Sequence, residues 1–75
     1  MTVMLNRKKL RARRREKELI QEKLAEESGL SDRYIRSLEC EAAQPSAAVL
    51  YRLSRALEVP TDELITTTLD GNEEN

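Results

Sequence analysis

The sequence predicts an all-α domain of five short helices. Its 75 residues are 39% hydrophobic but only 3% aromatic, so the core must be built from Leu, Ile, Val and Ala, which pack well between helices. The chain has two glycines and two prolines, and a run of β-branched residues appears only at Ile65–Thr68, so a sheet has little from which to grow. A chain of this length forms one small domain, which we expect to span residues 1–69.

The first helix is expected to begin at Leu5 or Asn6 and to end near Lys17. Asn6 can cap its first turn, because the side-chain oxygen accepts a hydrogen bond from a free backbone N–H. Leu10 is the main core contact of this helix, and most of the other residues are basic. We therefore expect one face to be buried and the rest to be cationic.

Residues 21–39 have the layout of a helix-turn-helix, two short helices that cross at a tight turn. The first of them, residues 21–28, buries Leu24 and Ala25, and Ala25 is small enough for the next helix to approach closely. Gly29 ends this helix, because glycine adopts the left-handed conformation that other residues reach only with strain.

The next helix is expected to begin after Ser31, whose hydroxyl can cap it, and to end near Cys40 or Glu41. Ile35 and Leu38 lie three positions apart, so they share one side and form the buried seam. The same spacing turns four residues outward: Asp32, Arg33, Arg36 and Ser37. A polar outward face of this kind suits a DNA groove.

A fourth helix follows a connector that ends at Pro45. Proline keeps the preceding residue out of helical geometry, and Ser46 can cap the helix, which is expected to run to Leu57. Its apolar residues recur at intervals of three and four and define one buried face: Val49, Leu50, Leu53, Ala56 and Leu57.

A short fifth helix is expected after Pro60. Thr61 can cap it, and the helix is expected to bury Leu64 and Ile65. The acidic tail, residues 70–75, contains nothing to bury and is expected to be disordered.

Residue usage narrows the class of function. The chain has no histidine and one cysteine, Cys40, so it lacks the usual ligands of a structural zinc site and the parts of a Ser–His or Cys–His nucleophile. We expect no catalytic residue, no metal and no cofactor. No stretch is apolar enough for a bilayer and no signal peptide opens the chain, so we expect a cytoplasmic protein without membrane contact.

The net charge of −1 conceals a strong asymmetry. Residues 1–17 carry eight basic residues against one acidic residue, a net charge of +7, and the remainder carries −8. The basic residues are Arg7, Lys8, Lys9, Arg11, Arg13, Arg14, Arg15 and Lys17. They fit either a solvated helix with ion pairs to acidic neighbours or a helix that faces DNA phosphates, and their density favours the second.

Taken together, these features resemble the phage-repressor-like, Cro-type (XRE-like) helix-turn-helix family over about residues 7–66. The resemblance rests on a set of residues at family spacing: Arg14, Gln21, Leu24, Ala25, Gly29, Ser31, Ile35, Leu38, Glu39, Pro45, Ser46, Ala56, Leu57, Asp62, Glu63 and Leu64. It implies a compact five-helix, lambda-repressor-like domain whose third helix enters the major groove of double-stranded DNA, usually as a homodimer on a palindromic site. It also implies a transcriptional regulator, of repressor type, and not an enzyme.

Two roles are carried over from the family to the start of the helix-turn-helix. Gln21 matches a glutamine that commonly bonds a DNA phosphate and braces the recognition helix; a plain surface glutamine is the alternative. Arg14 and Glu39 match a partly buried ion pair that ties the first helix to the third. Glu39→Ala is therefore expected to destabilise the domain before it affects recognition.

The third helix supplies the candidate base readers. Arg33 can bond guanine O6 and N7 together, whereas Arg36 more readily meets phosphate and Ser37 is short and tolerant of the base. Asp32 either caps the helix or accepts from cytosine N4, with capping favoured. Tyr34 either packs its ring on the second helix while its hydroxyl meets a phosphate, or only packs. The full set of candidate DNA-contacting residues is Arg14, Gln21, Ser31, Asp32, Arg33, Tyr34, Arg36 and Ser37.

The chain departs from its relatives at several turns. Relatives often have glycine where this chain has Glu18, Glu41 and Glu58, and Ser or Thr where it has Ile20. If the third helix ends in a left-handed turn at Glu41, that conformation costs about 1 kcal/mol. The alternative is that the helix continues for one or two more residues.

Two classes of function remain open on the sequence. The first is the DNA-binding regulator; the second is a protein-interaction module of the same fold, an antitoxin or adaptor that binds a protein partner through the acidic faces of its second and third helices. RNA binding by the first helix is less favoured, because that helix has no aromatic residue to stack on bases. The dimer surface is expected at the C-terminal end of the domain, with Val59, Leu64, Ile65 and Leu69.

Overall fold

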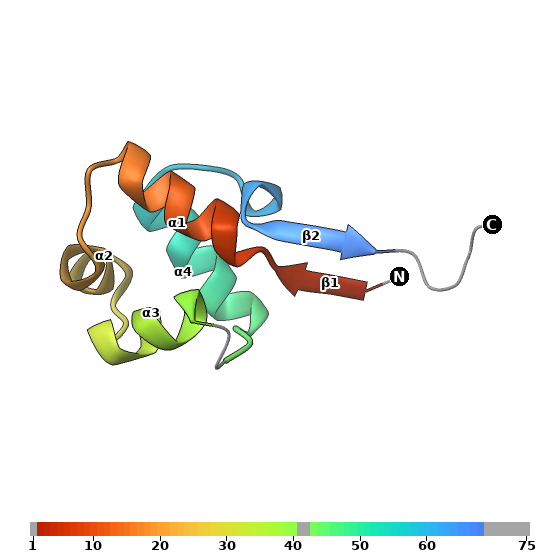
Figure 1. Ribbon diagram of the computed structural model, residues 1–75, viewed down its shortest axis with the longest axis horizontal. Helices are drawn as coiled ribbons and strands as arrows, with labels where there is room; N and C mark the ends of the chain where they lie inside the picture. The colour runs from red at the N-terminus through yellow and green to blue at the C-terminus, as the bar shows by residue number, and fades with distance from the viewer. Residues whose placement is uncertain (1, 41–42, 69–75) are drawn as a thin grey trace.

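The computed structural model describes residues 2–40 and 43–68. Within these residues the chain forms four α-helices, one 3-10 turn and a two-stranded antiparallel sheet (Figure 1). In chain order the elements are β1 (Thr2–Leu5), α1 (Arg7–Glu16), α2 (Gln21–Ser28), α3 (Asp32–Glu39), α4 (Ala47–Leu57), η1 (Thr61–Glu63) and β2 (Ile65–Thr68).

The prediction of five helices and no sheet is wrong at the two ends of the chain. The expected fifth helix is the single 3-10 turn η1, and Ile65 begins β2 instead of ending a helix. β2 pairs with β1 in a register that places Leu5 opposite Ile65 and Val3 opposite Thr67. The β-branched residues of β2 favour a strand, and the strand forms because the N-terminal residues supply an antiparallel partner some sixty positions away.

The helix boundaries within the body match the sequence closely, because local capping groups define them. Asn6, Ser31 and Ser46 accept hydrogen bonds from the backbone N–H groups of Lys9, Tyr34 and Val49, at 3.0, 3.0 and 3.2 Å. α1 starts at Arg7, one position after its cap, and α2 has the predicted limits.

Two of the three glutamates at positions where relatives often have glycine, Glu18 and Glu58, adopt the left-handed turn conformation. Gly29 ends α2 with φ of 74°, and Glu18 and Glu58 adopt the same left-handed region with φ of 58° and 59°. Glu58 is the C-cap of α4, and its carboxylate accepts a hydrogen bond of 2.7 Å from Lys17 Nζ. The third glutamate, Glu41, lies outside the described residues, as does the tail predicted to be disordered.

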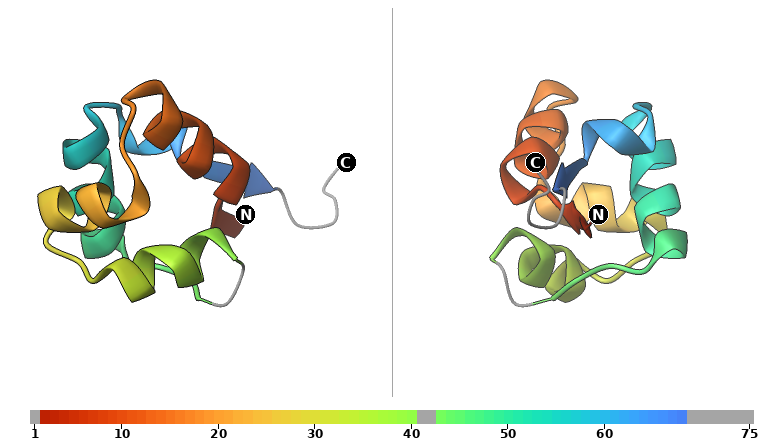
Figure 2. Two further views of the ribbon diagram at one scale, coloured as in Figure 1. Left: turned by 60° about the vertical axis from the view of Figure 1, so that its left-hand side comes forward. Right: turned by 90° about the vertical axis from the view of Figure 1, so that its right-hand side faces the viewer.

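The core is built from aliphatic side chains of every helix and of the sheet. Leu24 and Ala25 of α2 and Ile35 and Leu38 of α3 are buried, as the predicted seam requires. Among the residues that the structure describes, the buried hydrophobic ones are Leu5, Leu10, Leu24, Ala25, Ile35, Leu38, Leu53, Leu57 and Leu64. α2 packs against both α3 and α4, and α1 packs against α3, so α3 is held on two sides (Figure 2).

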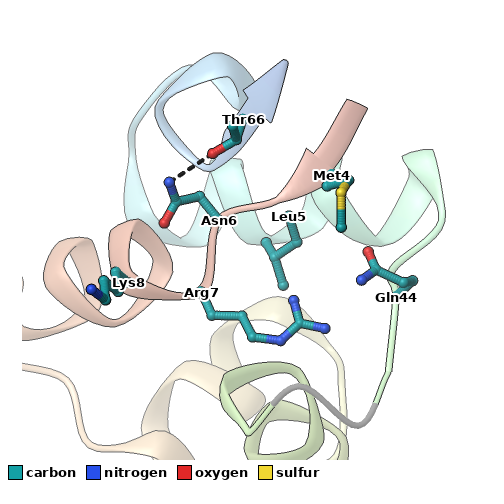
Figure 3. A pocket seen from close by; sticks show the side chains of 7 residues that line it. All are labelled: Met4, Leu5, Asn6, Arg7, Lys8, Gln44 and Thr66. Carbon is teal, nitrogen blue, oxygen red and sulfur yellow. Dashed lines mark hydrogen bonds between the residues drawn. The ribbon is translucent and has the colours of Figure 1, made fainter. Parts of the chain in front are cut away.

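The two ends of the described chain meet in one place. Both strands leave the helical body at the same end (Figure 1). Asn6 fixes their base, because its backbone N–H donates to Leu64 O at 2.8 Å and its side-chain amide donates to Thr66 Oγ1 at 2.7 Å (Figure 3). None of the described helices combines the length and apolar composition needed to cross a membrane.

Candidate nucleic-acid interface

α3 is amphipathic, and its outward face is the polar surface that the sequence predicts. Ile35 and Leu38 are fully buried, whereas Arg33 and Arg36 are exposed and Ser37 is half-buried. Among the residues that the structure describes, Arg33 has no ion-pair partner, so its guanidinium is available to a ligand.

Arg36 is held by neighbours on both sides. Its guanidinium forms an ion pair of 3.4 Å with Asp32, one turn earlier in α3, and its Nε donates to Gln21 Oε1 at 3.4 Å. The second contact brings the start of α2 beside the outward face of α3. Asp32 itself is the first residue of the helix and Ser31 is its cap, so the capping role favoured for Asp32 is wrong. Ser31 is the cap because its hydroxyl, and not the Asp32 carboxylate, accepts the Tyr34 N–H.

Gln21 connects this outer face to the interior. Its amide Nε2 donates to Glu39 Oε1 at 3.1 Å while its Oε1 accepts from Arg36. Both ends of the amide are therefore engaged within the protein, and one N–H of the Nε2 group remains for an external acceptor.

Beneath Gln21, Arg14 and Glu39 form a buried bidentate ion pair. Arg14 Nε and Nη2 lie 2.7 and 3.0 Å from the two Glu39 carboxylate oxygens, and Arg14 Nη1 donates to Leu19 O at 2.8 Å. Burial alone raises the pKa of the Glu39 carboxyl, but the hydrogen bonds from Arg14 and Gln21 and the charges of Arg14 and Arg11 outweigh it, so the pKa lies below its usual value. Arg14 is itself buried, which gives it a structural position within the body.

Two further arginines of α1 brace the end of α3 and the connector that follows it, and neither contact was predicted from the sequence. Arg11 Nη2 donates to Glu39 O at 3.0 Å, and Arg7 Nη2 donates to Ala43 O at 2.9 Å. The missed signal was their spacing, because Arg7, Arg11 and Arg14 follow one another at intervals of four and three and so share the face of α1 that meets α3.

The cationic helix therefore serves two purposes. Five of its eight basic residues make polar contacts with described residues. Three of the five are Arg7, Arg11 and Arg14, and the other two are Arg13, paired with Glu16 at 2.8 Å, and Lys17, paired with Glu58. Lys8, Lys9 and Arg15 are exposed and form no ion pair with a described residue. Ion pairing and phosphate contact are the two alternatives that the sequence leaves for this helix, and ion pairs with described residues account for four of its eight basic residues.

The other candidate residues occupy positions that support the helix-turn-helix. Tyr34 is half-buried and packs against the core, which both alternatives for this residue require. Ala25 is 4% exposed where α2 meets α3, and Gly29 supplies the left-handed turn between the helices. Cys40 is exposed, and no group of three potential metal ligands occurs in the described part of the chain.

An outward polar helix with exposed arginines, held by a small helical body and flanked by the start of a second helix, defines the class of helix-turn-helix DNA-binding domains. The comparisons agree: the helix-turn-helix family matches residues 10–64, and the chain belongs to that family. A curated relative, the uncharacterized HTH-type transcriptional regulator y4dJ of Sinorhizobium fredii, is 46% identical over 55 residues, which cover 73% of this chain and 71% of that protein.

Two solved structures are similar in both sequence and fold. One is the restriction-modification controller protein C.AhdI from Aeromonas hydrophila, with a TM-score of 0.74 and 33% identity over 76% of this chain and 86% of that chain. The other is the DNA-binding domain of the P22 C2 repressor, with a TM-score of 0.73 and 31% identity over 83% of this chain and 82% of that one. The protein is thus a DNA-binding transcriptional regulator of the phage-repressor-like (XRE-like) class, which is not a class of enzymes.

Proposed function

We propose that this protein binds a specific sequence of double-stranded DNA as a dimer, with α3 in the major groove, and acts as a repressor of transcription. The observation that carries the proposal is the exposed arginine on the outward face of the well-packed helix α3. Arg33 is exposed and has no ion-pair partner within residues 2–40 and 43–68, on a helix whose opposite side is fixed by Ile35 and Leu38. A rigid helix with a free guanidinium is what direct readout of a base edge requires.

Within this proposal the outward residues have different tasks. Arg33 reads guanine through O6 and N7, and Ser37, four positions later, contacts the neighbouring base. Arg36 and Gln21 meet the phosphate backbone, and their mutual contact of 3.4 Å presents both donors together. Asp32, by pairing with Arg36, limits the charge that Arg36 offers to phosphate.

The relatives support the repressor role by their own functions. One is a DNA-binding domain of a phage repressor and another is the controller protein of a restriction-modification system. Repression follows when such a domain occupies a site that the transcription machinery needs.

Selection of binding sites from a random pool of DNA tests the proposal. An enriched palindrome, with half-sites about one helical turn apart, is the expected result. The purified protein is then titrated on the enriched duplex and on a scrambled duplex over a range of salt concentrations. Failure to enrich any sequence, with equal affinity for both duplexes, contradicts the proposal.

The engaged cations of α1 favour a second candidate, the protein-interaction module of the same fold. Arg7, Arg11, Arg13, Arg14 and Lys17 are already bonded within the body, which leaves few charges for phosphate. The salt titration separates the two candidates. A regulator loses affinity for any duplex steeply as salt rises, whereas an interaction module binds DNA weakly at every salt concentration.

A further inference from the structure

A surface cavity lies where the first turn of α1 meets β1, and the proposed DNA contacts do not use it. We call it the α1 cavity. It lies between β1, the start of α1 and the connector that precedes α4 (Figure 3), and its volume is about 480 Å³. That volume falls within the range of roughly 300–1,000 Å³ that is usual for small-molecule sites. The α1 cavity is therefore large enough for an organic ligand.

One wall of the α1 cavity is apolar. Met4 and Leu5 supply it, and Met4 is 46% exposed although it is a large hydrophobic residue. Figure 3 shows the Met4 side chain pointing toward Gln44, whose amide can both donate and accept hydrogen bonds. A ligand that covers Met4 removes apolar surface from water, which is favourable. This wall therefore selects a ligand with an apolar part.

The charge of the α1 cavity selects an anion. Of the described residues that line it, Arg7 and Lys8 are basic and none is acidic. Figure 3 shows the Arg7 guanidinium below Leu5 and on the side of Gln44, whereas the Lys8 side chain points away. Arg7 is therefore the cation that a ligand meets directly, and Lys8 adds to the positive potential around it.

The Arg7 guanidinium has hydrogen-bond donors to spare. Its Nη2 donates to Ala43 O at 2.9 Å, and its Nε is buried without a hydrogen-bond partner in the described part of the chain. No described carboxylate forms an ion pair with it. The remaining Nη hydrogens can donate to a carboxylate, in charge-assisted bonds about twice as strong as neutral ones. Because Arg7 is half-buried, water screens this attraction less than it would at an exposed lysine.

We propose that the α1 cavity binds a small carboxylate with a short apolar body. The carboxylate accepts hydrogen bonds from the Arg7 guanidinium, and the apolar body covers Met4. A DNA phosphate would also satisfy Arg7, but it has no apolar part to cover Met4, so the combination of the two side chains favours the organic acid. None of the residues assigned above to base or phosphate contact lines this cavity, so the inference does not rest on the proposed function.

The first test compares four probes that separate charge from apolar surface: hexanoate, hexan-1-ol, acetate and inorganic phosphate. Each is titrated into the full chain without DNA, at constant pH and ionic strength, and binding is followed by the NMR chemical shifts of the backbone amides. Hexanoate is expected to give saturable shifts at Met4, Arg7 and Gln44. The other three probes are expected to bind at least about tenfold more weakly, because each lacks either the carboxylate or the apolar body.

The second test uses variants of the same chain. Arg7→Gln is expected to weaken hexanoate binding by at least about tenfold, because it removes the charged donor. Lys9→Gln is the matched control: it removes one positive charge from an exposed position of α1 that does not line the cavity, and it is expected to bind hexanoate as wild type does. Met4→Ser leaves Arg7 in place and is expected to weaken hexanoate binding while acetate binding stays unchanged. Thermal melting verifies that all three variants fold.

Four results overturn the inference. The first is the absence of saturable shifts with hexanoate. The second is binding of acetate or phosphate as tight as that of hexanoate, which would leave only a general anion site, and the third is equally tight binding of hexan-1-ol, which would leave the charge without a role. The fourth is an equal loss in Arg7→Gln and Lys9→Gln. None of these results bears on DNA recognition, which the selection of binding sites tests separately.

Discussion

Glu39 shows how a single charged residue can be essential to a core of leucines. Its side chain is 2% exposed, and it accepts hydrogen bonds from Arg14 and Gln21. Removal of the carboxylate charge leaves the Arg14 guanidinium buried without its partner, which is the costly way to break such a pair. The sequence could identify this pair only through the family resemblance, because nothing in the local pattern links two residues 25 positions apart.

Glu39→Gln is expected to lower the free energy of unfolding at pH 7 by about 3 kcal/mol. The folded state holds the pKa of Glu39 below its ordinary value near 4.5. The stabilisation is therefore fully present above about pH 4.5 and is lost as the pH falls through the folded-state pKa. Urea unfolding between pH 7 and pH 2.5 measures both effects, and the acid-dependent part should shrink in the variant.

Glu58→Gln is the matched control for this measurement. A hydrogen bond and charge from Lys17 also lower the pKa of Glu58, but that carboxylate is exposed. Its replacement is expected to change stability little. Equal destabilisation in the two variants contradicts the role assigned to burial of the Arg14–Glu39 pair.

Arg33→Ala is expected to lower affinity for the selected site by about 1–3 kcal/mol and to relax the preference at one base pair. Arg36→Ala is expected to weaken binding on all sequences alike and to reduce the salt slope by about one. Fluorescence anisotropy on the selected duplex and on a set of single-base variants distinguishes the two patterns. A uniform loss for Arg33→Ala reassigns that residue to phosphate.

At the scale of elements, the caps and turns explain why the helix limits could be predicted. Asn6, Ser31 and Ser46 act within three residues of themselves, so the sequence alone contains their effect. Backbone strain at Glu18 and Glu58 is also local, because both adopt a left-handed conformation that glycine adopts at no steric cost.

Glu18→Gly is expected to stabilise the domain by about 0.5–1 kcal/mol, because relief of the left-handed strain exceeds the entropy gained by the unfolded chain. Glu27→Gly, inside α2, is the control and is expected to destabilise by about 1 kcal/mol, since glycine weakens a helix interior. Thermal unfolding of both variants checks the opposite signs. A destabilised Glu18→Gly contradicts the assignment of strain to this turn.

At the scale of the whole molecule, the sheet joins the two ends of the chain and closes one end of the core. Leu5 enters the core from β1, and Leu64, expected at the dimer surface, is fully buried just before β2. Leu64 therefore cannot belong to the expected dimer surface. Of the other three expected members, Val59 and Ile65 are half-buried and Leu69 lies outside the described residues.

Leu5→Ala is expected to destabilise the domain by about 2–4 kcal/mol, because it leaves a cavity in a small core of aliphatic side chains. Val3→Ala, two positions earlier on the same face but exposed, is expected to cost much less. Urea unfolding measures both. Similar losses for the two variants contradict the assignment of Leu5 to the core and of Val3 to the exposed end of the sheet.

The sequence by itself determined what depends on near neighbours along the chain: the four helices, their caps, the buried seam of α3 and the outward direction of Arg33 and Arg36. Tertiary structure alone decided the rest. Pairing of β1 with β2 and the division of the α1 cations between internal and exposed positions both depend on groups that meet only after the helices have packed. Helical periodicity and capping act over three or four residues, whereas strand partners and ion-pair partners are chosen among all residues that folding brings together.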